Sequence, residues 1–166
     1  DRFNGEAEYE TIRAICESIS IPVFANGDVT TAPQAREVLD YTGAAGLMVG
    51  RGAQGNPWIF RELNHYLQTG EILPPPLPTV VHAVMRDHLQ RLHDFYGETH
   101  GVRIARKHVG WYLKERNNSK HILYDLMRAQ TAKEQFQLLE QHFPDAPGAG
   151  HADPSRVAST EGPLAL

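Results

Sequence analysis

The sequence contains a single cysteine, Cys16, so no disulfide can form within the chain. A chain without disulfides is typical of a reducing compartment, and we expect a cytoplasmic protein. There is no apolar run of about 18 residues, which excludes a membrane-spanning helix, and the start does not resemble a signal peptide. Residue 1 is Asp rather than Met, and a helical pattern follows almost at once. We therefore interpret the sequence as a piece of a longer protein, or as a truncated reading of its gene.

Positive charge is scarce in most of the chain but not in its middle. The 166 residues carry 16 Lys/Arg and 20 Asp/Glu, a net charge of −4, which by itself argues against a nucleic-acid partner. Residues 1–78 hold 5 Lys/Arg and 10 Asp/Glu, whereas residues 79–130 hold 9 Lys/Arg and 5 Asp/Glu, a net of +4. This middle block is a candidate surface for a polyanion. The alternative is a helical bundle whose charges only face water.

Helices and short apolar strands alternate over the first 70 residues. The pattern predicts helices at 6–19, from Thr30 or Thr31 to Gly43, and from Asn56 to Gly70, with strands at 21–25 and 45–50. Both strands are uniformly apolar, which is typical of a parallel sheet covered on both sides. We predict an α/β fold whose remaining strands are not in this sequence.

A proline-rich linker, residues 71–78, separates residues 1–70 from a second, all-helical domain at 79–143. The apolar periodicity of this second domain predicts four helices, at 79–96, 100–116, 119–130 and 132–143. Residues 144–166 are rich in Pro, Gly, Ala, Ser and Asp, and we predict a disordered tail there.

Each predicted strand ends in a polar turn that contains glycine: Asn26-Gly27-Asp28 and Gly50-Arg51-Gly52. Function gathers at the carboxyl ends of parallel strands, and two such loops commonly share a phosphate at the last strands of a (β/α)8 barrel. Backbone amides and the Arg51 guanidinium suit a phosphate. One glycine turn alone indicates only a tight turn, but the pair favours phosphate binding. Asp28 would repel a phosphate, so we expect it to cap the next helix or to hold Arg51.

The predicted helix at 100–116 has an apolar face and an opposite basic stripe. The apolar face comprises Val102, Ala105, Val109, Tyr112 and Leu113, and the stripe comprises His100, Arg103, Lys107 and Lys114. Such a stripe suits the phosphate backbone of RNA, with a solvated face as the alternative. Arg106 flanks the apolar face, and Arg106 and His108 are further candidates for RNA contact.

The two tryptophans and the remaining histidines invite other interpretations. We expect Trp58 and Phe60 to form the joint between barrel and helix rather than a flavin platform. We expect Trp111 to pack against a neighbouring helix, although it could stack on an unpaired base. The histidines show no spacing typical of a metal site, so we predict no metal.

The motifs "ANGD", "GLMVGRGAQGNPWIF", "LHDFYG" and "RIARKHVGWYLK", in this order and with the proline-rich linker, resemble bacterial tRNA-dihydrouridine synthases, in particular the B-type enzymes. The resemblance runs from about residue 3 to residue 143 and covers the C-terminal portion of such an enzyme. It implies the end of a (β/α)8 TIM barrel followed by a helical tRNA-binding domain. It also implies reduction of uridine in tRNA to 5,6-dihydrouridine, with FMN carrying hydride from NADPH.

The resemblance also implies roles for individual residues. The residues that match the flavin-binding positions are Asn26, Gly27, Asp28, Gly50 and Arg51, and those assigned to RNA are Arg103, Arg106, Lys107 and Lys114. The catalytic cysteine of the family lies on an earlier barrel loop. Cys16 falls on an apolar stripe, where cysteine usually acts as a small apolar residue, so we assign no catalytic residue and expect the chain alone to be inactive. Two alternatives stay open: another phosphate-binding barrel enzyme, and a non-catalytic RNA-binding module.

Overall fold

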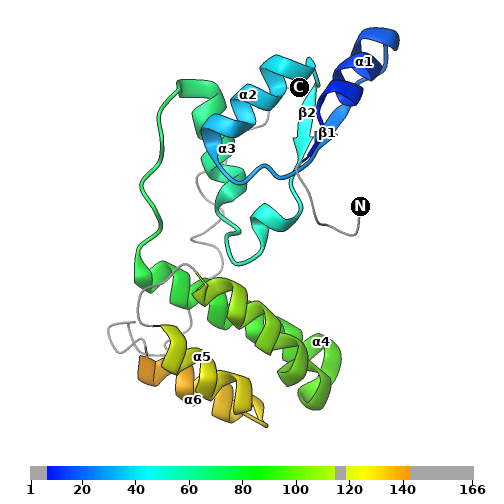
Figure 1. Cartoon of the computed structure of the whole chain (residues 1–166). Helices are drawn as coiled ribbons and strands as arrows, with labels where there is room; N and C mark the ends of the chain where they lie inside the picture. Colours follow the sequence, from blue (N-terminus) through cyan, green and yellow to red (C-terminus); the bar gives the residue numbers. More distant parts are fainter. Residues whose placement is uncertain (1–6, 115–118, 143–166) are drawn as a thin grey trace.

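The computed structural model describes residues 7–114 and 119–142, and Figure 1 shows them as an α/β part followed by a set of helices. The elements of the α/β part (residues 7–70) are α1 (Glu10–Ser18), β1 (Phe24–Asn26), α2 (Ala32–Thr42), β2 (Gly46–Met48), the 3-10 helix η1 (Arg51–Ala53) and α3 (Ile59–Thr69). The two strands are parallel neighbours, with Phe24 opposite Gly46 and Asn26 opposite Met48. Their carboxyl ends therefore meet at one edge, as predicted.

The sequence around the start of α2 explains why the helix begins there. The Thr31 hydroxyl accepts a hydrogen bond from the Gln34 N–H at 3.4 Å, and the Gln34 side chain accepts one from the Thr30 N–H at 2.9 Å. The first bond satisfies an N–H group that the first turn of the helix leaves unpaired, and the second ties the residue before the cap to that turn. Thr31 is the N-cap, Pro33 lies in the first turn and Gly43 ends the helix. The prediction for this helix is confirmed, with Thr31 rather than Thr30 as the cap.

Among the described residues, helices cover the strands on one side only, so the expected covering on both sides stays a prediction. Ala25 of β1 is fully buried in a core shared with residues of α2 and α3. In contrast, Phe24 and Met48 are 66% and 64% exposed, because the described residues place helices against one side of the sheet and nothing over these side chains. An apolar surface of this kind usually marks an interface with further chain.

Two predicted helix starts differ from the structure. Helix α1 begins at Glu10 rather than at residue 6, and residues 1–6 lie outside the described part. Helix α3 begins at Ile59 rather than at Asn56, because residues 56–59 form a turn in which the Ile59 N–H donates to the Asn56 carbonyl at 3.3 Å. The predicted tail at 144–166 also lies outside the described residues.

Residues 78–142 form the helical part, which follows the irregular segment 71–77. Its elements are α4 (Pro78–Leu113), α5 (Ser119–Arg128) and α6 (Ala132–His142). Helix α4 contains a break at Gly97, where φ is +72° and ψ is 164°. A side chain would be strained at this φ, so glycine lets the chain turn back on itself. The two arms of α4, residues 78–96 and 98–113, correspond to the two separate helices that were predicted.

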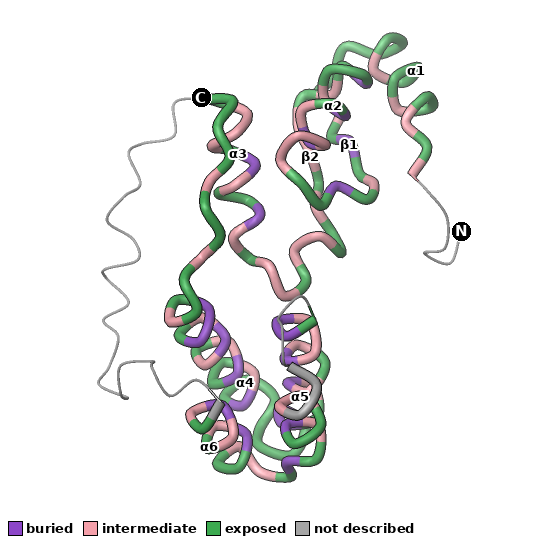
Figure 2. Tube along the Cα trace, turned by 60° about the vertical axis from the view of Figure 1, so that its left-hand side comes forward, coloured by how far each residue is buried: buried purple, intermediate pink, exposed green. Residues whose placement is uncertain are grey.

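The arms of α4 pack against each other and against α5 and α6 around one apolar core. Fully buried side chains from all of these elements form it: Val81, Met85, Leu89, Ala105, Val109, Leu126 and Leu139. Figure 2 shows the buried residues along the inner faces of these helices. The five residues predicted for the apolar face of 100–116 are all buried. The prediction of that face is confirmed.

Trp58 joins the α/β part to the helical part, as predicted, whereas Phe60, expected to share this role, is 49% exposed. It lies just before α3 and packs against the core of the helical part, with its ring edge-on to that of Tyr112 at 6.4 Å between centroids. The chain also approaches closely at Gly55, where φ is +76° and an added Cβ would lie 2.3 Å from the carbonyl oxygen of Trp111. The segment after β2 is therefore seated directly on the second arm of α4.

Candidate functional site

The two polar turns line one cleft of about 710 Å³ at the carboxyl edge of the strands. All five residues predicted to bind the cofactor phosphate contribute to its lining: Asn26, Gly27, Asp28, Gly50 and Arg51. The strand register brings them together, since Asn26 and Met48 are paired residues at the last position of each strand. The volume is in the range of small-molecule sites in proteins.

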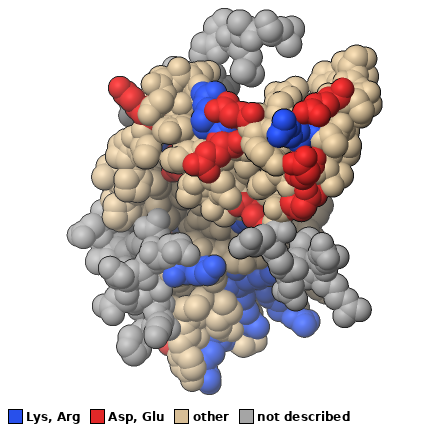
Figure 3. Space-filling view, turned by 45° about the horizontal axis from the view of Figure 1, so that its top comes forward, with Lys and Arg blue, Asp and Glu red and all other residues tan. Residues whose placement is uncertain are grey.

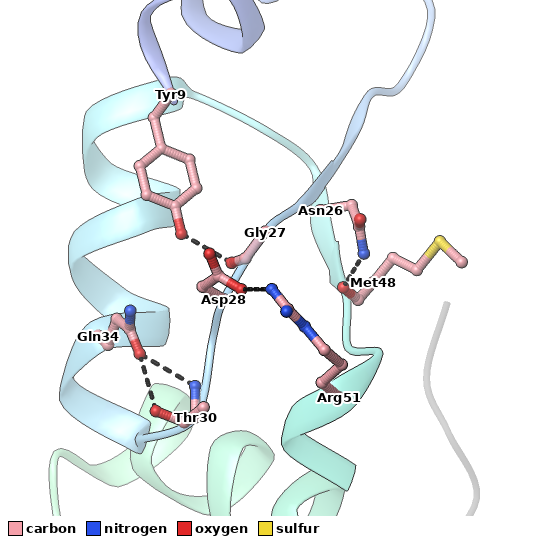
Figure 4. A network of polar contacts seen from close by, with 8 residues as sticks. All are labelled: Tyr9, Asn26, Gly27, Asp28, Thr30, Gln34, Met48 and Arg51. Carbon is pink, nitrogen blue, oxygen red and sulfur yellow. Dashed lines mark hydrogen bonds and ion pairs between the residues drawn. The ribbon is translucent and has the colours of Figure 1, made fainter. Parts of the chain in front are cut away.

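Hydrogen bonds from side chains hold the first turn in place (Figure 4). The Asn26 amide donates to the carbonyl oxygen of Met48 at 2.7 Å, which ties the ends of the two strands together. The Tyr9 hydroxyl donates to the carbonyl oxygen of Gly27 at 2.7 Å. Burial, with a contribution from the Asp28 charge, raises the pKa of Tyr9, so this hydroxyl keeps its proton. Tyr9 was not among the predicted site residues, because it lies 17 or more residues from both turns in the sequence and is brought to Gly27 only by the fold.

Asp28 and Arg51 form an ion pair that connects the two turns (Figure 4). Of the two roles expected for Asp28, the structure shows the one of holding Arg51, whereas Thr31 caps α2. Asp28 has a positive φ of 34°, which is uncommon for a residue other than glycine. The Arg51 side chain is still 50% exposed at the cleft. The pair thus orients a guanidinium toward a space that a ligand can enter.

The opposite wall of the cleft comes from the helical part, through Trp111 and Lys114. The Trp111 ring contacts its own helix: the His108 ring lies edge-on at 5.0 Å and the Lys107 ammonium lies 4.9 Å from the ring centroid. These contacts place Trp111 at the cleft, and its expected packing against a neighbouring helix stays a prediction.

The basic stripe of the second arm is exposed at each predicted position. His100, Arg103, Lys107 and Lys114 all face solvent. Figure 3 shows Lys and Arg side chains gathered over the helical part, whereas most acidic side chains on the same face lie over the α/β part. The stripe runs along one helix toward the cleft, and Lys114 belongs to both.

Arg106 is turned inward rather than along the stripe. Its guanidinium donates to the carbonyl oxygen of Ala129 at 2.8 Å, and its Nε is buried with no hydrogen-bond partner among the described residues. The contact joins the second arm of α4 to the segment after α5. The predicted RNA role of Arg106 therefore stays a prediction that must compete with a structural contact, one that helical periodicity cannot detect.

His88 and His108 of α4 contribute little positive charge to this surface. The rings of His88 and His108 lie 4.7 Å apart, and Nδ1 of His88 is 3.2 Å from the Tyr112 hydroxyl. Burial lowers the pKa of both histidines, and for His108 the charges of His88 and Lys107 lower it further. Both rings are thus neutral near pH 7. His108 is for that reason a poorer phosphate contact than the lysines beside it.

Neither a metal site nor a membrane span is found in the part of the chain that the structure describes. No group of three or more His, Cys, Asp or Glu side chains is placed to hold a metal ion there. No helix of the described ranges is both long and apolar enough to cross a membrane. Cys16 is a partly exposed free thiol on α1 and does not line the cleft.

The fold and the site define an α/β protein that has a cleft at its strand ends and a helical part after it. Comparison with known proteins identifies the family. The family model described as Dihydrouridine synthase (Dus) matches residues 1–147. tRNA-dihydrouridine synthase B of Proteus vulgaris is 53% identical over 141 residues, and that of Escherichia coli strain K12 is 54% identical over 141 residues. Each alignment covers 85% of this chain and 44% of the relative. The chain belongs to the dihydrouridine synthase family and spans less than half the length of these relatives.

Proposed function

We propose that this chain provides the flavin-phosphate site and the RNA-binding surface of an oxidoreductase that reduces uridine in tRNA to 5,6-dihydrouridine, with FMN as cofactor and NADPH as reductant. The observation that carries the proposal is the cleft, which brings two strand-end turns and a fixed arginine together beside a basic helix. Membership of the dihydrouridine synthase family favours this activity over another phosphate-binding barrel enzyme.

The residues of the cleft fit the phosphate end of FMN. Arg51, oriented by Asp28, supplies the charged donor. No described atom lies within 4 Å of a Cβ added at Gly50, which leaves room for a ligand to approach the backbone there, whereas the corresponding space at Gly27 is filled by Ala7. Asn26 keeps the two turns in register through its bond to the Met48 carbonyl. When bound, FMN supplies hydride transfer, while the protein binds and orients it. No residue of this chain is assigned a proton-transfer role.

The α/β part fits the end of a (β/α)8 barrel. Each strand is followed by a helix, the strands are parallel, and the functional turns lie at their carboxyl ends. The exposed Phe24 and Met48 side chains suit the packed interior of a barrel, where layers of apolar side chains from the strands meet. Further strands in contact with this surface would cover it.

The activity itself is testable with the full-length protein and an unmodified tRNA transcript. We expect dihydrouridine to form only when FMN and NADPH are both present, as measured by mass spectrometry of the digested nucleosides. A protein that bound tRNA tightly but took up no flavin would contradict the proposal. It would favour the alternative of a non-catalytic RNA-binding module.

The basic stripe should bind the tRNA backbone. Replacing Arg103 and Lys107 by glutamine should weaken tRNA binding and reduce the slope of log affinity against log salt by roughly one to two, because each lost phosphate contact removes a little under one unit. Filter binding over a series of salt concentrations measures both. Lys133→Gln, an exposed lysine on α6, is the matched control. A double variant with the wild-type slope would mean that the stripe faces only water.

A further inference from the structure

Lys114 differs from the other basic residues of α4 because it lines the cleft that Arg51 also lines. It lies at the C-terminal end of the second arm and is exposed. Among the described residues no ion pair involves it, whereas Arg51 is paired with Asp28. The cleft thus has cations on two walls, one from each part of the chain.

The charges of the lining show why the second cation matters. Among the residues that the structure describes, the charged ones around the cleft are Asp28, Arg51 and Lys114. Asp28 and Arg51 offset each other's charge, so the net positive charge of the described lining is that of Lys114. A phosphate carries one or two negative charges and gains most from a site with a net positive field. In such a site Arg51 provides correctly oriented hydrogen-bond donors, and Lys114 provides the net positive charge.

The position of Lys114 relative to Arg51 is fixed by contacts between the two parts. Gly55, which follows η1, abuts the backbone of Trp111 and Tyr112, and Trp58 packs on the ring of Tyr112. On the helical part, Trp111 and Tyr112 lie within one helical turn of Lys114. On the α/β part, Gly55 lies four residues after Arg51 in the sequence. The two cations therefore belong to one preorganised site rather than to two independent surfaces.

We propose that Lys114 is a second phosphate-binding cation of the cleft, contributed by the helical part across the junction. This inference rests on the proposed function, which places a nucleotide in the cleft. The ligand group is a phosphate, which comes either from FMN or from the backbone of the bound RNA. The flexible stem of lysine lets its ammonium reach a phosphate anywhere along this wall. The competing explanation is that Lys114 only offsets the negative end of the α4 dipole.

The test compares FMN with riboflavin, which lacks the phosphate, in the full-length protein stripped of flavin. Quenching of flavin fluorescence gives both dissociation constants, and their ratio reports the contribution of the phosphate. The proteins are wild type, Lys114→Gln, Lys114→Arg, Arg51→Gln and the Lys133→Gln control. If Lys114 binds the FMN phosphate, Lys114→Gln should lower the riboflavin-to-FMN ratio by about three- to tenfold, and Lys114→Arg should largely restore it.

tRNA binding by the same proteins distinguishes the second source of phosphate. If Lys114 binds RNA, Lys114→Gln should leave the flavin ratio unchanged but weaken tRNA binding and lower the salt slope by about one. If Lys114→Gln changes neither the riboflavin-to-FMN ratio nor tRNA binding, the inference is overturned. If that variant only loses thermal stability, Lys114 offsets the helix dipole and binds no phosphate. In either case Arg51→Gln should still lower the riboflavin-to-FMN ratio, because the Arg51 site does not depend on Lys114. If wild type binds FMN no better than riboflavin, the proposed phosphate site fails instead, and Lys114 with it.

Discussion

Replacing Gly55 with alanine should destabilise the protein by roughly 3 kcal/mol or more, because two penalties combine at this position. Gly55 has a φ of +76°, a conformation that costs an alanine about 1–2 kcal/mol. The added methyl group would also lie 2.3 Å from the carbonyl oxygen of Trp111 and 2.7 Å from the backbone nitrogen of Tyr112. Neither atom can move without shifting the end of α4. Urea unfolding of the full-length protein measures the change.

Gly70 provides a matched control for the same substitution. It also has a φ of +76°, but nothing lies within 4 Å of an added Cβ. Gly70→Ala should therefore cost only the conformational term, about 1–2 kcal/mol. The difference in the free energy of unfolding between the two variants therefore measures the contribution of the backbone contact at the junction. Equal destabilisation of both would mean that the α/β part and the helical part do not meet at Gly55 in solution.

Gly55→Ala should also affect the cleft, because the contact that it disturbs positions one wall of the cleft. The Gly55 contact holds Trp111 and Lys114 on the wall that faces Arg51. A variant that stays folded by moving the helical part away would widen the cleft, because the two walls belong to different parts of the chain. Glycine at position 55 is thus required by the packing of two backbones, a requirement that cannot be read from the sequence pattern.

Features that depend on neighbouring residues in the sequence were predictable. The cap of α2 follows from Thr31 and Gln34, and the buried face of the second arm follows from its periodicity. The convergence of the two polar turns follows from parallel strands, since their carboxyl ends share an edge. In each case the interacting residues lie within one element, or in elements related by a general rule of topology.

Features that depend on what lies opposite an element were not predictable. Periodicity showed that the strands are apolar, but not that Phe24 and Met48 would be uncovered by the described residues. It placed Arg106 beside the apolar face, but not against the Ala129 carbonyl. It grouped Lys114 with the RNA stripe, but could not show that the cleft reaches this residue. These limits share one cause: a helical or strand pattern identifies which face is apolar or charged, but not which residues lie against that face.

The second large effect is expected at Arg51, whose replacement by alanine should weaken FMN binding by about 10- to 100-fold. A hydrogen bond to a charged group contributes about 1.5–3 kcal/mol, and this guanidinium is already oriented by Asp28. Flavin titration of the full-length apoprotein measures the loss. Arg13→Ala on α1 is the control, because Arg13 is paired with Glu17 and does not line the cleft.

The Asp28–Arg51 ion pair allows a second test. The direction in which Asp28→Asn changes FMN affinity distinguishes phosphate binding by Arg51 from general damage to the site. In Arg51→Ala the carboxylate of Asp28 remains at the cleft without its partner and repels a phosphate. Adding Asp28→Asn to that variant removes the repulsion and should recover several-fold of the lost FMN affinity. In the wild-type background the same change should weaken binding, since Arg51 loses the group that orients it. If Asp28→Asn lowers FMN affinity equally in both backgrounds, the two residues act independently, and Arg51 does not bind the phosphate in the way proposed.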